Sequence, residues 1–155
     1  MIRIGLLVAL VSWAGLVCVP DVASADDFKK SDKEVNGRFA GSWKVVSMER
    51  DGKEIGEAFK GAKWVFTKTT LAARFPGEGE AKFAYQARKG DKVGTIDLEV
   101  VESARDGGPR KRVYVGIYSL EGDALKICYA ATGKERPKEF ATKADSGDTL
   151  VVLKR

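Results

Sequence analysis

Residues 94–101 read Gly-Thr-Ile-Asp-Leu-Glu-Val-Val, and this stretch decides the fold class. Apolar residues occupy every second position from Ile96 to Val100, and polar or charged residues lie between them. A period of two predicts a β-strand with one face in a core and the other in water. Asp97 and Glu99 then share the outer face, so we interpret them as solvated side chains rather than as a pair of catalytic acids.

Short apolar runs of the same kind flank this stretch on both sides. Turn signals such as Asp51-Gly52 and Pro76-Gly77 separate them, and residues 57–60 are typical of one helical turn. Short strands with short connections predict an all-β fold, namely a single antiparallel up-and-down β-barrel, which leaves no exposed strand edge. We expect about eight strands, at residues 41–50, 63–68, 69–75, 81–88, 94–101, 111–120, 124–130 and 149–154.

The composition limits the chemistry. The chain has 155 residues, which fits one domain, and it carries 27 Lys and Arg against 22 Asp and Glu, for a net charge of +5. It contains no His and two Cys. The lack of His excludes His-dependent triads and His zinc ligands, and two Cys are too few for a four-cysteine metal site or a disulfide framework. We therefore expect no metal site, no cofactor and no enzymatic activity.

The first 25 residues have the layout of a secretory signal peptide. Arg3 precedes an apolar run over residues 4–19, and Ala23-Ser24-Ala25 offers small residues for cleavage. The run is shorter than the roughly 20 apolar residues that a membrane span needs. An uncleaved anchor and lipidation at Cys18 are the alternatives, although Val17 is larger than lipidation signals usually accept. We expect export to the periplasm, the envelope or the extracellular space, with no transmembrane segment after cleavage.

The exported chain then divides in two. Residues 26–38 are charged and poor in apolar side chains, which predicts a flexible leader, and residues 39–155 form the barrel domain. Cys128 is the one cysteine left after cleavage, so no internal disulfide is expected. Its place in a strand favours a small buried hydrophobe, and a reactive thiol or an intermolecular bridge is the alternative.

A family resemblance accompanies this pattern. Gly41-Ser42-Trp43 is similar to the Gly-x-Trp opening strand of lipocalins, in which a basic residue of the last strand, here Lys154 or Arg155, packs on the Trp by a cation–π contact. Over residues 39–155 the chain resembles a planctomycetal conserved, lipocalin-like domain of exported proteins. The resemblance rests on residues 41–53, 61–66, 95–98, 116–128, 133–137 with Phe140, and 150–155. It implies the barrel and the export, and it implies no catalytic residues. Ala72-Ala73-Arg74 and residues 100–102 depart from the family pattern.

Aromatic side chains in the expected strands are the candidates for a ligand site. Tyr114 and Tyr118 share one strand face, and Trp43 and Tyr85 occupy other strands. If the tyrosine face lines the interior, a polar-rimmed pocket follows. Strand aromatics also form filled cores, so a packed interior without a cavity is the alternative.

Two basic features complete the candidates. Arg136, in the segment Gly133-Lys134-Glu135-Arg136-Pro137, is placed to bind a carboxylate or phosphate, or to pin its loop to the barrel. Arg110-Lys111-Arg112 is a dense basic cluster that suits an anionic polymer, and its alternative is a solvated turn.

These features support two functional hypotheses. The first is an exported, non-enzymatic barrel that binds a small apolar or amphipathic ligand through Trp43, Tyr85, Tyr114, Tyr118 and Arg136. The second is a cell-envelope module that binds a protein or an anionic polymer through a basic outer surface. An enzyme that uses Asp or Glu is the least favoured interpretation, and export argues against nucleic acid as a partner.

Overall fold

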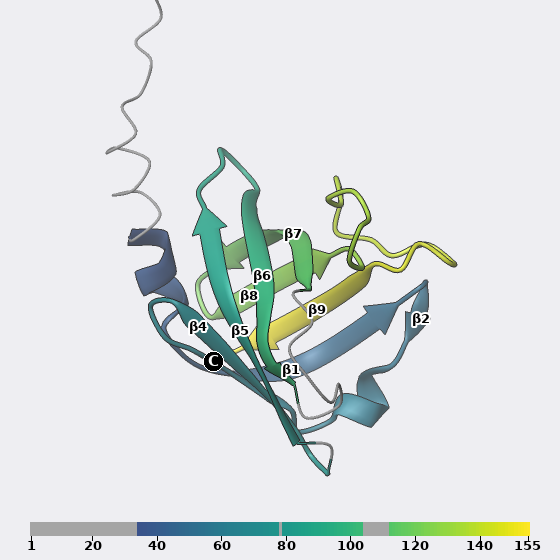
Figure 1. The fold of residues 1–155 in the computed structure, drawn as a ribbon, viewed down its shortest axis with the longest axis horizontal. Helices are drawn as coiled ribbons and strands as arrows, with labels where there is room; N and C mark the ends of the chain where they lie inside the picture. The colour runs from purple at the N-terminus through teal and green to yellow at the C-terminus, as the bar shows by residue number, and fades with distance from the viewer. Residues whose placement is uncertain (1–33, 78, 104–111) are drawn as a thin grey trace, which may run out of the picture.

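The alternating segments pair in chain order, each with the next, in the computed structural model shown in Figure 1. The structure describes residues 34–77, 79–103 and 112–155. The pairing is antiparallel throughout these residues, and the last strand returns to pair with the first. The barrel strands are β1 (Gly41–Arg50), β3 (Lys63–Phe66), β4 (Thr70–Phe75), β5 (Gly79–Arg88), β6 (Gly94–Ser103), β7 (Val113–Glu121), β8 (Ala124–Tyr129) and β9 (Thr149–Lys154).

The expected all-β, up-and-down barrel of about eight strands is therefore confirmed. The nine-stranded sheet comprises these eight and β2 (Lys53–Glu54), which extends β1 as a short hairpin. Asp51 and Gly52 both have positive φ, 53° and 73°, as the hairpin turn of an Asp-Gly pair requires. A 3-10 turn, η1 (Gly56–Phe59), lies within one residue of the predicted helical turn.

Strand β1 closes the barrel because it has a neighbour on each side. Its first four residues pair with β3, and its residues from Lys44 onward pair with β9. The register shifts between Val45 and Ser47, so Val46 forms a β-bulge and is 56% exposed. A bulge bends a strand and reverses the faces of the residues beyond it. Trp43 before the bulge and Met48 after it consequently both face the interior, where both are buried.

Side chains from every barrel strand meet in one core. The expected inward residues Ile96, Leu98, Leu125 and Ile127 are buried there, and Val100 and Tyr129 are half-buried. Gly94 lies against the ring of Tyr118, and a Cβ at this position would stand only 2.2 Å from ring atoms. The glycine gives the tyrosine room to lie flat across β6.

A short helix covers one end of the barrel. Residues 34–39 are helical, and Val35 and Phe39 are 7% and 0% exposed. Residues 34–38, which we expected to belong to the flexible leader, are therefore helical, and Val35 packs them against the core. The helix lies at the left in Figure 1, and we call this the helix end of the barrel. The opposite end, where β1 finishes and β9 begins, is the Arg50 end.

The long segment between β8 and β9, residues 130–148, covers part of the outer surface. Ile117 and Cys128 are cross-strand partners that face away from the barrel axis, yet they are only 5% and 0% exposed. The Sγ of Cys128 lies 3.8 Å from the carbonyl oxygen of Ala141, in this segment. Cys128 is therefore a buried side chain. In Figure 1 the segment forms the yellow-green and yellow loops at the right.

Several sequence expectations lie outside the described residues. These are the signal peptide at residues 1–25, the leader as far as residue 33, and Arg110 and Lys111 of the basic cluster. Arg112 is described and is half-buried. None of the helices within the described ranges has the length and apolar character of a membrane span.

Candidate functional site

Three of the five candidate ligand residues, Trp43, Tyr85 and Tyr118, lie in the core toward the helix end. The indole Nε1 of Trp43 donates to the carbonyl oxygen of Phe39 at 2.8 Å. The hydroxyl of Tyr85 lies 2.8 Å from the carbonyl oxygen of Thr67 and 3.2 Å from that of Asn36. Burial raises the pKa of the Tyr85 phenol, which keeps it protonated.

Phe39 of the helix is the centre of this aromatic cluster. Its ring centroid lies 4.9 Å from that of Tyr118, 5.6 Å from that of Phe66 and 6.0 Å from that of Tyr85. Phe39 thereby occupies the space beside these rings that a ligand would need at the helix end. The sequence pattern did not reveal this role, because a single Phe before the first strand has no periodicity.

The expected cation–π contact between the end of the last strand and Trp43 is present at the same end. The guanidinium carbon of Arg155 lies 4.5 Å from the centroid of the Trp43 ring, as the sequence predicts for Lys154 or Arg155. Arg155 also donates to the carbonyl oxygen of Arg38 at 2.6 Å and to that of Ala40 at 3.3 Å. These bonds tie the end of the helix to the end of the chain.

Arg136 adopts the pinning role that was one of its two expected roles. Its Nη1 donates to the carbonyl oxygens of Gly116 and Ile96 at 2.6 and 3.2 Å, and its Nη2 donates to Asp97 at 2.7 Å. Asp97 also lies 3.6 Å from Arg88. Asp97 is thus held between two arginines, and Arg136 fixes segment 130–148 to β6 and β7.

Tyr114, the fifth candidate, lies toward the Arg50 end and is half-buried. Its ring centroid is 5.7 Å from that of Tyr129 and 6.4 Å from that of Phe83, both in edge-on contacts. On the other side of this end, Phe59 of η1 packs edge-on against Phe75 at 5.3 Å. Half-buried aromatic rings therefore surround the Arg50 end.

A polar cluster lies among these rings. Thr149 is 1% exposed, and the Nε of Arg50 donates to its hydroxyl at 3.1 Å. Burial raises the pKa of the Tyr129 phenol, while the charge of Arg50 and a hydrogen bond with Thr149 oppose that rise. Among the described residues, Arg50 has no carboxylate within ion-pair distance.

The bulge explains why sequence reasoning missed Arg50. Uninterrupted alternation from the inward Trp43 would place Arg50 on the outer face of β1. The extra residue at Val46 shifts the phase, so Arg50 pairs with the inward Thr149 instead. Two consecutive apolar residues, Val45 and Val46, followed by Met48 out of phase, are the local signal that could have indicated the bulge.

Arg50 also lines a surface hollow of about 360 Å³. The hollow is open to solvent, and four of its six lining residues are charged. The rim is held by segment 130–148: the amide of Gly147 donates to Asp51 at 2.6 Å, and Thr142 hydrogen-bonds Glu49. The lining residues are Arg50, Asp51, Lys53, Ile55, Ala144 and Asp145.

Two further observations concern buried groups. The indole Nε1 of Trp64, which is 3% exposed, has no hydrogen-bond acceptor among the described residues. The pKa of the Cys128 thiol rises from 9.0 to about 11, mainly because burial disfavours the thiolate and also because Asp148 is near. Within the described ranges, no cluster of three His, Cys, Asp or Glu side chains is placed to hold a metal ion.

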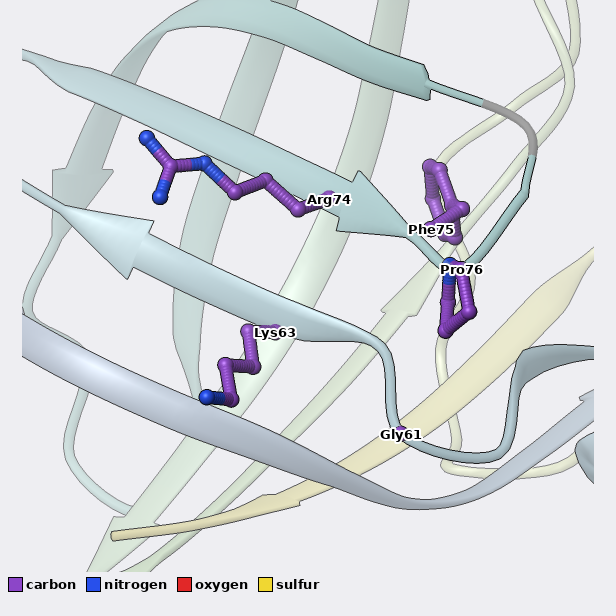
Figure 2. Close-up of a pocket in the computed structure, with 5 residues that line it drawn as sticks. All are labelled: Gly61, Lys63, Arg74, Phe75 and Pro76. Atoms are coloured by element: carbon purple, nitrogen blue, oxygen red, sulfur yellow. The ribbon is translucent and has the colours of Figure 1, made fainter.

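A second, smaller hollow of about 210 Å³ lies on the outer surface between β3 and β4. Figure 2 shows the Lys63 and Arg74 side chains leaving these neighbouring strands and extending in the same direction, away from Pro76. Gly61 and Phe75 complete its lining.

Comparison with known proteins gives no information on function, so the function is inferred from these residues. The chain was compared with protein-family models, with curated proteins and with solved structures, and none of the three comparisons gives a match.

Proposed function

We propose that the protein is an exported, non-enzymatic barrel that binds a small amphipathic carboxylate at its Arg50 end. The observation that carries this proposal is Arg50, an exposed residue at the inward register position opposite Thr149. It donates to the buried Thr149 and lines the 360 Å³ hollow, and it has no carboxylate partner among the described residues. A guanidinium group suits bidentate binding of a carboxylate. The anionic head of the ligand is assigned to Arg50.

The apolar part of such a ligand has two neighbours here. Ile55 lines the hollow, and the half-buried rings of Tyr114 and Tyr129 lie at the same end of the barrel. The hollow itself is largely polar, because Asp51, Lys53 and Asp145 lie beside Arg50 in its lining. The carboxylate of Asp51 is engaged by the amide of Gly147. We place the ligand at this end and not in the barrel interior. Phe39 occupies the space beside the aromatic residues at the helix end.

We also propose that the protein is exported and that it is not an enzyme. Export is supported by the basic residue, apolar run and small residues within residues 1–25. The resemblance to the planctomycetal lipocalin-like domain supports it too. A binding role rather than catalysis is supported by the lack of His and by the engagement of Asp97 and Asp51 in structural bonds.

Titration with naphthoate, an aromatic carboxylate, tests this assignment. We expect saturable one-to-one binding by calorimetry, weakened about tenfold or more in Arg50→Gln because a charge-assisted bond is lost. Naphthylmethanol, which lacks the carboxylate, should bind both forms equally. Lys60→Gln is the matched control, because Lys60 is an exposed cation beside η1 outside the hollow lining. Equal naphthoate affinity in Arg50→Gln and the parent protein would refute the role of Arg50.

A further inference from the structure

Four exposed basic side chains form a single row across the outer face of the barrel. The register pairs Lys154 with Lys44, Lys44 with Lys63, and Lys63 with Arg74. The row therefore crosses β9, β1, β3 and β4 with one cation on each strand, and all four side chains are exposed. We call Lys154, Lys44, Lys63 and Arg74 the basic row. Its members are far apart in the sequence, so the charge pattern along the chain does not reveal it.

The basic row opposes the stability of the sheet. Like charges directly opposite one another on neighbouring strands are destabilising. Only its last member is neutralised within the described residues: Arg74 is paired with Glu80 across β4 and β5. None of the three lysines has a carboxylate within ion-pair distance in the described ranges. The row consequently presents an uncompensated positive charge to solvent, for which the fold gives no structural reason.

The shape of the basic row favours a linear partner. Neighbouring strands lie about 4.8 Å apart, so the row spans about 15 Å. Four of the eight barrel strands take part, and these four cover half of the closed sheet. A planar bilayer would meet only part of so curved a row, whereas a flexible chain can follow it. The adjacent outward positions Ser42, Val65 and Ala72 are uncharged, so the cations stand in single file.

The hollow between Lys63 and Arg74 adds a place for the uncharged part of a repeating unit. This hollow of about 210 Å³ is lined by the two cations and by the apolar Phe75 and Pro76. Figure 2 shows the two basic side chains on their neighbouring strands. Single-stranded nucleic acids stack their bases on exposed aromatic side chains, whereas Phe75 is only half-exposed. The exposed large hydrophobic side chains of the described residues are all valines.

The geometry points to the basic row as a binding surface for a linear acidic polysaccharide, with the carboxylates of successive sugars on successive strands. The row lies on the outer face of the sheet and shares no residue with the lining of the Arg50 hollow. This inference therefore stands or falls independently of the proposed small ligand.

Polygalacturonate, which carries one carboxylate on each sugar, is the probe for calorimetric titration of the protein at low salt. We expect saturable binding that weakens as salt is added. Lys63→Gln and Lys44→Gln should each weaken it by about two- to fivefold, the range of one exposed ion pair. The matched control is Lys138→Gln, which removes the same charge from an exposed position in segment 130–148. Neutral dextran should not bind.

A gain of affinity gives the sharper test. Glu80→Gln releases Arg74 from its carboxylate, so we expect binding of polygalacturonate to become about two- to fivefold tighter. The melting temperature of each variant checks that the fold is intact. Equal losses in Lys63→Gln and Lys138→Gln would overturn the assignment, and so would absence of binding. Stronger binding to phosphatidylglycerol vesicles than to the polymer at equal total charge would replace the polysaccharide with a membrane surface.

Discussion

Arg136 shows how one side chain can hold a long loop in place. It satisfies two backbone carbonyls and a carboxylate at once, and all three acceptors belong to β6 or β7. A planar guanidinium can make these bonds in one fixed geometry, whereas an ammonium group cannot. The residue that resembles an anion-binding arginine in the sequence thus bonds to acceptors of its own protein.

We expect Arg136→Lys to lower the free energy of unfolding by about 2 kcal/mol, because charge-assisted bonds are lost and the carbonyls stay poorly paired. Urea unfolding followed by tryptophan fluorescence measures the change. Lys134→Gln, at an exposed position of the same segment, is the control and should change stability little. A change in Arg136→Lys no larger than in this control would contradict the pinning role.

Cys128 makes the free energy of unfolding depend on pH in the alkaline range. Its pKa of about 11 in the folded state exceeds the ordinary 9.0, so the fold favours the neutral thiol. Below about pH 9 both states are protonated and this contribution is complete. Between about pH 9 and pH 11 the unfolded chain ionises first, so the free energy of unfolding falls, by at most about 2 to 3 kcal/mol.

Comparison with Cys128→Ala isolates this effect from the buried tyrosines. The stability difference between the parent protein and the variant should shrink as the pH rises from about 8 to 11. Denaturant unfolding at each pH provides the values. A difference that stays constant over this range would show that Cys128 does not titrate as its buried position implies.

At the scale of elements, the helix at residues 34–39 acts as a plug for the barrel. Phe39 contributes most of this role, because its ring touches three other aromatic rings while being fully buried. We expect Phe39→Ala to cost about 3 to 5 kcal/mol, the usual loss when a buried phenylalanine leaves a cavity. Thermal unfolding measures the loss.

The same variant offers a second readout. An apolar cavity bounded by Phe66, Tyr85 and Tyr118 should stay dry and accept benzene, as engineered apolar cavities do. Benzene should therefore raise the melting temperature of Phe39→Ala and leave that of the parent protein unchanged. If benzene stabilised both equally, the helix end would already contain accessible space.

Local patterns predict the strands well because alternation is a property of neighbouring residues. The stretch at 94–101 needed only its own sequence to indicate β6, and β9 has the predicted bounds. Cross-strand register is not local. The bulge at Val46 turns Arg50 inward, and the pairing of Lys63 with both Lys44 and Arg74 builds the basic row. Both candidate surfaces of the molecule therefore depend on register, which the strand patterns alone do not determine.

At the scale of the whole molecule, the two ends of the barrel differ in the partners of their polar side chains. At the helix end, Trp43, Tyr85 and Arg155 all hydrogen-bond backbone carbonyls of the chain itself. At the Arg50 end, Arg50 has no carboxylate partner among the described residues. Arg50 donates its Nε to Thr149, which leaves its charge to attract a carboxylate, and we therefore place the proposed ligand at the Arg50 end.

The closure of the barrel through β1 and β9 has a mechanical consequence. Lys44, near the start of β1, lies beside Lys154, the last residue of β9, so the chain enters and leaves the barrel at the same place. A force that pulls the ends apart would act along the hydrogen bonds between these strands, since those bonds run perpendicular to the strands. The hydrogen-bonded residue pairs of β1 and β9 would then break one after another rather than all together. The β1–β9 pairing is thus the place at which tension would open the barrel.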